Sequence, residues 1–146
     1  MTQRAIAAVF MRGGASKAIM FHARDLPPDR DVWSRVFTAA MGSPDPNGRQ
    51  LDGMGGGVSS LSKVCVRAPP ERDDADIDYY TFAQILIKKD RADYSGNCGY
   101  MSSAVGPFAV DERLVSGTGE TANVRVYNSN TKKFIHATFP EESGSE

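Results

Sequence analysis

The sequence predicts an α+β domain in which a curved sheet of mixed strands surrounds one central helix. Most apolar segments have the lengths and alternation that are typical of strands. Only two segments follow helical periodicity, and strands do not alternate regularly with helices as a doubly wound fold requires. The second of these helices is apolar around most of its circumference, so it must be surrounded by protein.

The first strand is expected over Arg4 to Met11, where a nearly continuous apolar run is typical of burial on both faces. Two glycines then break the run, and Lys17 to His22 resumes extended character. Together these segments predict a hairpin whose loop carries Arg12, Ser16 and Lys17.

An amphipathic helix should follow, with Asp29 or Asp31 as its N-cap and Gly42, followed by Pro44, at its end. Its apolar residues recur with helical spacing: Trp33, Val36, Phe37, Ala40 and Met41. Residues 42–57 contain too many Gly and Pro residues for regular structure. They predict a long loop of the kind that is either functional or disordered.

The middle of the chain predicts strands over Val58 to Ala68 and Ile77 to Lys89, joined by an acidic surface turn. One face of the second strand should gather Ile77, Tyr79, Ala83, Ile85 and Ile87. The second helix is expected over Tyr100 to Leu114, with Pro107 kinking or dividing it. A closing hairpin over Val124 to Asn128 and Phe134 to Phe139 completes a single domain of residues 1–140, and residues 141–146 form a polar tail.

Composition limits the functions to consider. The 146 residues suit one domain with a substantial core. The chain has 17 Lys and Arg residues against 18 Asp and Glu residues, so neither nucleic acid nor an anionic membrane is an expected partner. No apolar run is long enough to span a bilayer, and the N-terminal segment does not match a signal peptide. Two cysteines without a CxxC spacing suit the reducing cytoplasm.

Cys98 is the residue that most clearly suggests chemistry. It lies at the start of the second helix, with Asn97 expected as N-cap, where free N–H groups and the helix dipole favour a thiolate or a bound carboxylate. The backbone of Cys98, Gly99 and Tyr100 is a candidate for holding that carboxylate. The alternative is a small structural cysteine at a helix start, an interpretation that also fits Cys65.

Several cations lie in or beside the glycine-rich loops. Lys63 follows one of them and is either a solvated lysine or, in a pocket, an acid or base. Arg12, Lys17 and Arg49 suit the binding of carboxylates, although each alone is more often a surface charge. The phosphate-loop, dinucleotide-binding and Gly-x-Ser-x-Gly motifs are absent, and the two histidines form no metal pattern with the cysteines, so no metal is predicted.

Five blocks taken together resemble the PrpF family: Met11–Lys17, Gly42–Gly56, Ser59–Val64, Ser95–Gly99 and Ala104–Phe108. They follow the family's order from about residue 4 to residue 139. The family includes 2-methylaconitate cis-trans isomerases and 4-oxalomesaconate tautomerases. The resemblance implies the diaminopimelate-epimerase-like fold, in which each of two similar domains is a strand barrel around a central helix and the active site lies between them.

The resemblance also implies roles for individual residues. Lys63 and Cys98 correspond to the family's catalytic pair, and the Arg12 to Lys17 loop and the Asn97 to Tyr100 segment to groups that hold substrate carboxylates. No metal, flavin, nicotinamide or pyridoxal phosphate is implied. The implied reaction is a cofactor-independent proton transfer on a small unsaturated polycarboxylate. Three residues depart from those usual in the family: Ala15, Ala18 and Tyr100.

Alternatives to catalysis remain open. Family members are more than twice as long as this chain, which therefore corresponds to their N-terminal half. The chain could thus be a truncated, non-catalytic domain that binds carboxylates or a partner protein. A homodimer could take the place of the second domain. A thiol redox function is disfavoured, because no resolving cysteine lies near Cys98 in the sequence.

Overall fold

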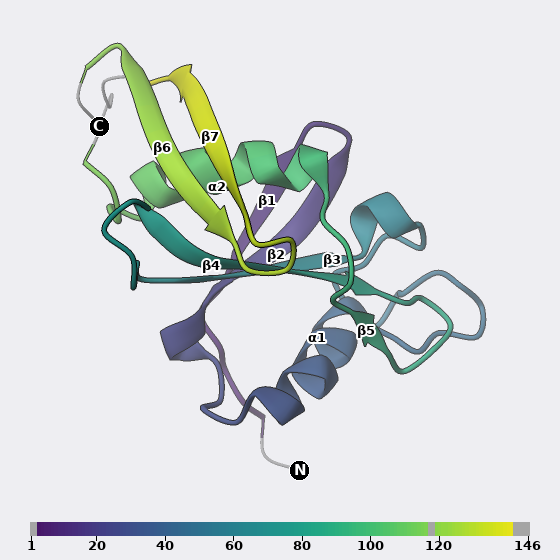
Figure 1. Ribbon diagram of the computed structural model, residues 1–146. Helices are drawn as coiled ribbons and strands as arrows, with labels where there is room; N and C mark the ends of the chain where they lie inside the picture. The colour runs from purple at the N-terminus through teal and green to yellow at the C-terminus, as the bar shows by residue number, and fades with distance from the viewer. Residues whose placement is uncertain (1–2, 117–118, 142–146) are drawn as a thin grey trace.

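The computed structural model describes residues 3–116 and 119–141, with the backbone alone at residues 78–80. Seven strands form one sheet, and the two α-helices pack on it from opposite sides (Figure 1). Hydrogen bonding follows the order β1-β2-β3-β4-β6-β7, and β5 pairs with β4 off this path. β2 runs parallel to β3 and β4 to β6, whereas the other pairs are antiparallel. The mixed sheet with few helices confirms the predicted α+β class.

The strands are β1 (Val9–Gly13), β2 (Ser16–His22), β3 (Lys63–Ala68), β4 (Ile77–Ile85), β5 (Ala92–Asp93), β6 (Thr121–Asn128) and β7 (Lys133–Pro140). The α-helices are α1 (Trp33–Met41) and α2 (Gly99–Asp111). Short 3-10 turns occupy Ala23–Asp25, Arg30–Val32 and Ser59–Leu61. The predicted hairpins at the two ends of the chain are present as β1–β2 and β6–β7.

β2 and β3 form the centre of the molecule, because a helix covers each of their faces. On one face, Ile19, Val64 and Val66 belong to the cluster packed against α1. On the other face, Met20 and Cys65 belong to the cluster packed against α2. Burial on both faces explains why the sequences of these two strands contain consecutive apolar residues.

α1 is the amphipathic helix that the periodicity predicts, and its buried apolar residues are Trp33, Phe37 and Met41. The predicted N-cap is wrong, because Val32 is the N-cap of α1; Asp29 instead caps the preceding 3-10 turn, with Oδ1 accepting the Asp31 N–H at 3.0 Å. Gly42 ends the helix with a φ of +77°, a left-handed conformation that glycine adopts without a Cβ clash.

α2 is buried on most of its sides. It contacts β1 and β2 near one end of the sheet order, and β6 and β7 at the other (Figure 1). Its buried positions are Met101, Ser102, Ala104, Val105, Gly106, Phe108 and Ala109. Pro107 lies inside the helix without dividing it, so of the two predicted outcomes the division is wrong and the kink stays a prediction. Among the described strands, β1 and β7 are not paired with each other, so the hydrogen-bonded order is open.

β1 differs from its prediction. It begins at Val9 rather than Arg4, and it is an edge strand in which Phe10 is 44% exposed. The expected burial on both faces is therefore wrong, because the helix that covers the neighbouring strands leaves the Phe10 side of β1 open to solvent. The ammonium group of Lys17 lies 5.7 Å from the Phe10 ring centroid and covers part of it.

The two central strand predictions need correction as well. β3 begins at Lys63, because the residues before it form a 3-10 turn, and β4 ends at Ile85. The single apolar face expected for β4 is divided, since Ile77 packs in the α2 cluster and Ala83 in the α1 cluster. A register shift in the β3–β4 pairing lies between Ile77 and Ala83, and it reverses which face of the sheet the odd-numbered side chains point to. The side chain of Tyr79, expected on that face, is outside the described part.

Glu141 is the last described residue, and its N–H donates to the Glu120 carbonyl at 3.0 Å. The rest of the predicted tail lies outside the described residues, and the domain boundary at residue 140 stays a prediction. Over residues 3–116 and 119–141, no helix has the length and apolarity needed to cross a membrane.

Candidate active site

The β1–β2 hairpin packs directly on the first turn of α2, and this contact forms the candidate site. A Cβ at Gly13 would overlap the main chain of Tyr100, and a Cβ at Gly14 would press on the Tyr100 ring. Gly14 also has a φ of +52°, which disfavours other residues. The two glycines therefore permit an approach of hairpin and helix that any larger residue would prevent.

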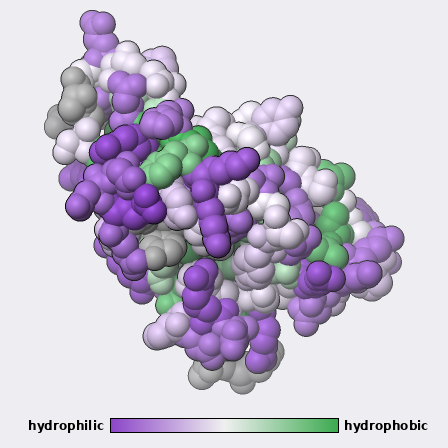
Figure 2. Space-filling view, in the orientation of Figure 1, coloured by the Kyte–Doolittle hydropathy of each residue, from purple (hydrophilic) through white to green (hydrophobic). Residues whose placement is uncertain are grey.

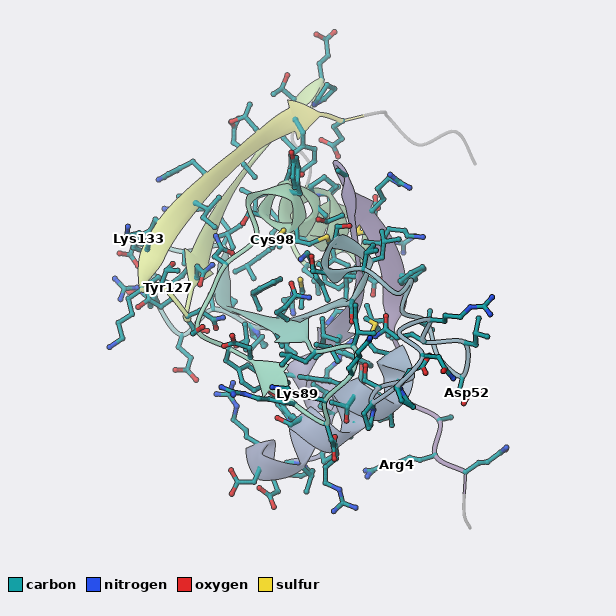
Figure 3. The ribbon with its side chains drawn as sticks, turned by 90° about the vertical axis from the view of Figure 1, so that its right-hand side faces the viewer. Arg4, Asp52, Lys89, Cys98, Tyr127 and Lys133 are labelled. Atoms are coloured by element: carbon teal, nitrogen blue, oxygen red, sulfur yellow. The ribbon has the colours of Figure 1, made fainter. Side chains whose placement is uncertain are left out.

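This approach places Cys98 beside Ser16. The Cys98 Sγ lies 3.7 Å from the Ser16 Oγ, and Ser16 is 2% exposed. Figure 3 shows Cys98 at the start of α2. Cys98 itself is half-buried and packs against the core cluster around α2.

Cys98, not Asn97, is the N-cap residue of α2, which corrects the predicted cap by one position. Its side chain makes no capping hydrogen bond. Asn97 is exposed, and its Oδ1 accepts from the Ser102 Oγ at 3.4 Å. No acceptor among the described residues binds the N–H groups of Gly99 and Tyr100, both of which are exposed. The helix start thus presents free donors next to the thiol.

Lys63 is buried, with 7% of its surface exposed. Its Nζ donates to the Ser59 carbonyl at 2.9 Å and to the Gln84 Oε1 at 2.6 Å, and lies 5.6 Å from the Phe82 ring centroid. Both acceptors are uncharged, and no carboxylate among the described residues forms an ion pair with Lys63. The site therefore holds a positioned ammonium group whose charge no described carboxylate neutralises.

Strand register places Lys63 and Cys98 at the same end of the same face of the sheet. Ala18 pairs with Lys63 across the parallel β2–β3 ladder, and Ser16 lies two residues before Ala18 on the same side of β2. Ala18 and Cys65 both pack in the α2 cluster, so this is the side that α2 covers. From strand spacings, the Cα atoms of Ser16 and Lys63 lie about 8 Å apart.

Gln84 positions Lys63 and was not predicted. Its Nε2 donates to the carbonyls of Ser59 (3.0 Å) and Ser62 (2.8 Å), while its Oε1 accepts from Lys63. The signal in the sequence is a polar residue inside the otherwise apolar run from Phe82 to Ile85, since polar groups in such places need partners.

Arg12 and Lys17 do not join this cluster. Arg12 is exposed and pairs in register with Lys17. Lys17 lies two residues before Ile19 and therefore on the same side of β2, the side of α1. Because successive strand residues point to opposite faces, Ser16 points toward α2, whereas Arg12 and Lys17 are on the other face. Of the three loop residues predicted to bind substrate, the structure brings only Ser16 to Cys98.

Arg49 lies elsewhere, in a hollow of about 210 Å³ lined by Asp45, Asn47, Arg49, Leu51 and Asp52. Figure 3 shows Asp52 on a loop well away from Cys98. The Arg49 N–H donates to the Asp45 carboxylate at 2.9 Å and, with the neighbouring Asn47 and Gln50 N–H groups, holds the pKa of Asp45 below its usual value. Arg49 therefore belongs to the internal organisation of this loop, and no described contact links it to Lys63 or Cys98.

Neither Cys98 nor Lys63 lines any of five hollows on the described surface. One of them, of about 370 Å³, adjoins the first turn of α2, where Gly99, Ser102 and Ser103 face β7. His136 lines its far side and is exposed. Among the described residues, no three His, Cys, Asp or Glu side chains converge as they would to hold a metal ion.

Structural comparison places the fold among isomerases and racemases. A crystal structure of methylitaconate-delta-isomerase superposes with a TM-score of 0.89 at 41% identity, covering 94% of this chain and 60% of that one. A probable proline racemase from Agrobacterium radiobacter K84 shares the fold alone, with a TM-score of 0.56 at 16% identity over 95% of this chain and 38% of that one. The fold class is therefore that of these racemases and isomerases.

The chain belongs to the PrpF family, because the family model for the PrpF protein matches residues 3–145. The 4-oxalomesaconate tautomerase of Pseudomonas putida is 43% identical over 99% of this chain and 39% of its own length. The 3-methylitaconate isomerase of Eubacterium barkeri is 42% identical over 97% of this chain and 37% of its own length. The 2-methyl-aconitate isomerase of Cupriavidus necator is 40% identical over 95% of this chain and 37% of its own length. The chain thus spans about two fifths of the length of these relatives.

Proposed function

We propose that this chain forms one wall of the active site of an isomerase that moves a proton on a small unsaturated polycarboxylate. The relatives' names indicate the substrate class, which includes 2-methylaconitate, 3-methylitaconate and 4-oxalomesaconate. The observation that carries the proposal is the shared position of Cys98, Ser16 and Lys63 at one end of the α2 face of the sheet. Two groups able to exchange protons lie there, next to free N–H donors.

In this proposal Cys98 is the base. Acting as a thiolate, Cys98 removes a proton from a carbon between a carboxylate and an alkene. The resulting negative charge spreads over the allylic system as a dienolate. The N–H groups of Gly99 and Tyr100 bind a substrate carboxylate, and the ammonium charge of Lys63 stabilises the dienolate.

Lys63 is the acid in this scheme. Both of its hydrogen bonds use its own N–H donors, and they hold the side chain in place. It returns a proton at the far end of the allylic system for a tautomerisation, or at the original carbon after bond rotation for a cis-trans isomerisation. No metal or organic cofactor takes part, since the substrate's carboxylates and alkene already delocalise the charge.

In this proposal the other side of the active site is formed by a second domain or by a second copy of this chain. We propose that the sheet curled around α2 is one of the two barrels of a diaminopimelate-epimerase-like architecture. The remaining length of a relative-sized protein, or a second copy of this chain, then closes the cleft and excludes water. The two free thiols support a location in the cytoplasm.

A second candidate is a domain of the same fold that binds carboxylates or a partner without turnover. The observation that favours it is that neither Cys98 nor Lys63 lines one of the five hollows, so the described surface alone does not enclose a substrate. Size measurement in solution separates the two candidates, because a monomer without isomerase activity supports the second one.

Deuterium exchange tests the proposal. Candidate acids are incubated in heavy water with this chain alone, with the P. putida tautomerase as a positive control, and the incorporation of deuterium at carbon is followed by NMR. We expect Cys98→Ala to lower exchange by about 10²–10⁴-fold, the usual contribution of a positioned acid or base. Cys65→Ala is the matched control, because Cys65 is a buried core residue. Near-normal exchange in Cys98→Ala would reject the assigned role.

A further inference from the structure

A basic hollow lies at the opposite end of β2 and β3 from Cys98, and the proposed reaction does not use it. It has a volume of about 310 Å³ and is lined by His22, Ala23, Arg24, Arg67, Pro69, Pro70, Arg113 and Leu114. Three of the lining residues are therefore arginines. In the view of Figure 2, hydrophilic side chains gather over the end of the sheet where β3 turns into β4.

Arg67 is the buried member of this cluster. It is 6% exposed, and its Nε is buried without an acceptor among the described residues. A buried N–H group of a cation that lacks a partner destabilises the fold until an acceptor is supplied. Burial, together with the charge of Arg24, lowers the pKa of Arg67 to about 10, while Glu112 opposes this change.

Glu112 and Asp25 are carboxylates that interact with these arginines. The Glu112 Oε2 lies 2.9 Å from the His22 Nε2 and is engaged there. Asp25 lies 3.9 Å from the exposed Arg24 Nε, a separation at which a solvated pair contributes little. The lining of the hollow itself contains three arginines and no Asp or Glu.

The backbone at Arg113 offers a separate observation. Arg113 follows α2 with a φ of +56°, a left-handed conformation at a helix end where glycine is the usual residue. Its N–H donates to the Val110 carbonyl at 2.9 Å, which closes the helix end. The chain thus accepts backbone strain at this position, and the Arg113 side chain lines the hollow.

We propose that this hollow binds a small oxyanion with two negative charges, a phosphate or a dicarboxylate, through Arg67, Arg24 and Arg113. Guanidinium groups donate parallel pairs of hydrogen bonds to such anions, and Arg67 has a buried Nε that no described acceptor binds. The walls formed by Pro69, Pro70 and Leu114 leave room for the apolar part of an organic anion. The inference is independent of the proposed isomerase chemistry.

An NMR titration tests this site. The chain is labelled with ¹⁵N and titrated with inorganic phosphate, with malonate as the dicarboxylate and with chloride at matched ionic strength. We expect a saturable shift of the Arg67 Nε–H resonance with phosphate or malonate and none with chloride. The anion with the higher affinity identifies the ligand class, and a response to neither anion overturns the proposal.

Arg113→Gly is the variant of choice, because glycine suits the left-handed conformation and the fold should be retained. Its thermal midpoint should equal or exceed that of the natural sequence. Its affinity for the anion should fall by about tenfold, the effect of losing a hydrogen bond to a charged group. Arg35→Ala, on the exposed face of α1, is the control and should bind normally. Unchanged affinity in Arg113→Gly overturns the proposal.

Discussion

β3 has a buried cation near each of its two ends, and the two cations differ in their hydrogen-bond partners. Lys63, at the start of β3, donates to a carbonyl and to an amide oxygen. Arg67, near the end of β3, has a buried Nε without an acceptor among the described residues. Both lie on the face covered by α2. The comparison teaches that a paired cation is held in one place, as a group that acts on a substrate must be, whereas the unpaired one is where we propose that an anion binds.

Replacing Lys63 should have the largest effect. We expect Lys63→Met to lower deuterium exchange into the substrate by about 10²–10⁴-fold, because the proposed acid and its positive charge are both lost. The exposed Lys88→Met is the matched control and should leave exchange unchanged. If the Lys63→Met variant is folded and catalyses deuterium exchange at the normal rate, Lys63 has a structural role only. The contrast drawn above between Lys63 and Arg67 is then contradicted.

The close packing of the hairpin on α2 predicts a smaller, structural effect. Gly13→Ala would place a Cβ against the main chain of Tyr100, so we expect it to reduce the free energy of unfolding by about 1–3 kcal/mol, as overpacking does. Gly96→Ala is the control, since a Cβ there would meet no atom within 4 Å. Urea unfolding compares the two variants with the natural sequence. Equal stability of the Gly13 and Gly96 variants would contradict the contact on which the site depends.

The ion pair between Arg125 and Asp76 should have the smallest effect. Hydrogen bonds from Arg125 hold the pKa of Asp76 below the ordinary value of 3.8. The stabilisation by Asp76 is therefore complete above pH 3.8 and is lost as the pH falls through the lower pKa of the folded state. We expect Asp76→Asn to cost less than about 1 kcal/mol at pH 7, because solvent screens the pair. Urea unfolding at pH 7 and at successively lower pH should show that this difference shrinks as the pH falls below 3.8, and a difference that grows in acid contradicts the assignment.

Local patterns in the sequence predicted the elements whose partners are close in the chain. The spacing of Trp33, Phe37 and Met41 predicted α1, and the two hairpins followed from apolar segments separated by turn residues. The all-round apolar character of α2 also predicted that this helix is buried on most of its sides. These signals are local because each depends on a helix or on neighbouring strands alone.

Features that depend on distant partners were missed. The exposure of Phe10 depends on β1 being the edge of the sheet, and the divided face of β4 depends on a register shift against β3. Neither is visible in the segment itself. The roles of Gln84 and Arg67 likewise require knowledge of which strand faces which helix. In contrast, strand alternation could have separated Ser16 from Lys17 before the structure was known.

The central claim is that Cys98 and Lys63 act on one substrate as a unit. Its most direct test is a double-mutant cycle in kcat/KM for deuterium exchange with Cys98→Ala, Lys63→Met and the combination. Groups that act together lose nearly all their contribution when either is removed, so the double variant should be about as active as the weaker single variant. If instead the two losses multiply in the double variant, the thiol and the ammonium group work independently and the account of a shared site is contradicted.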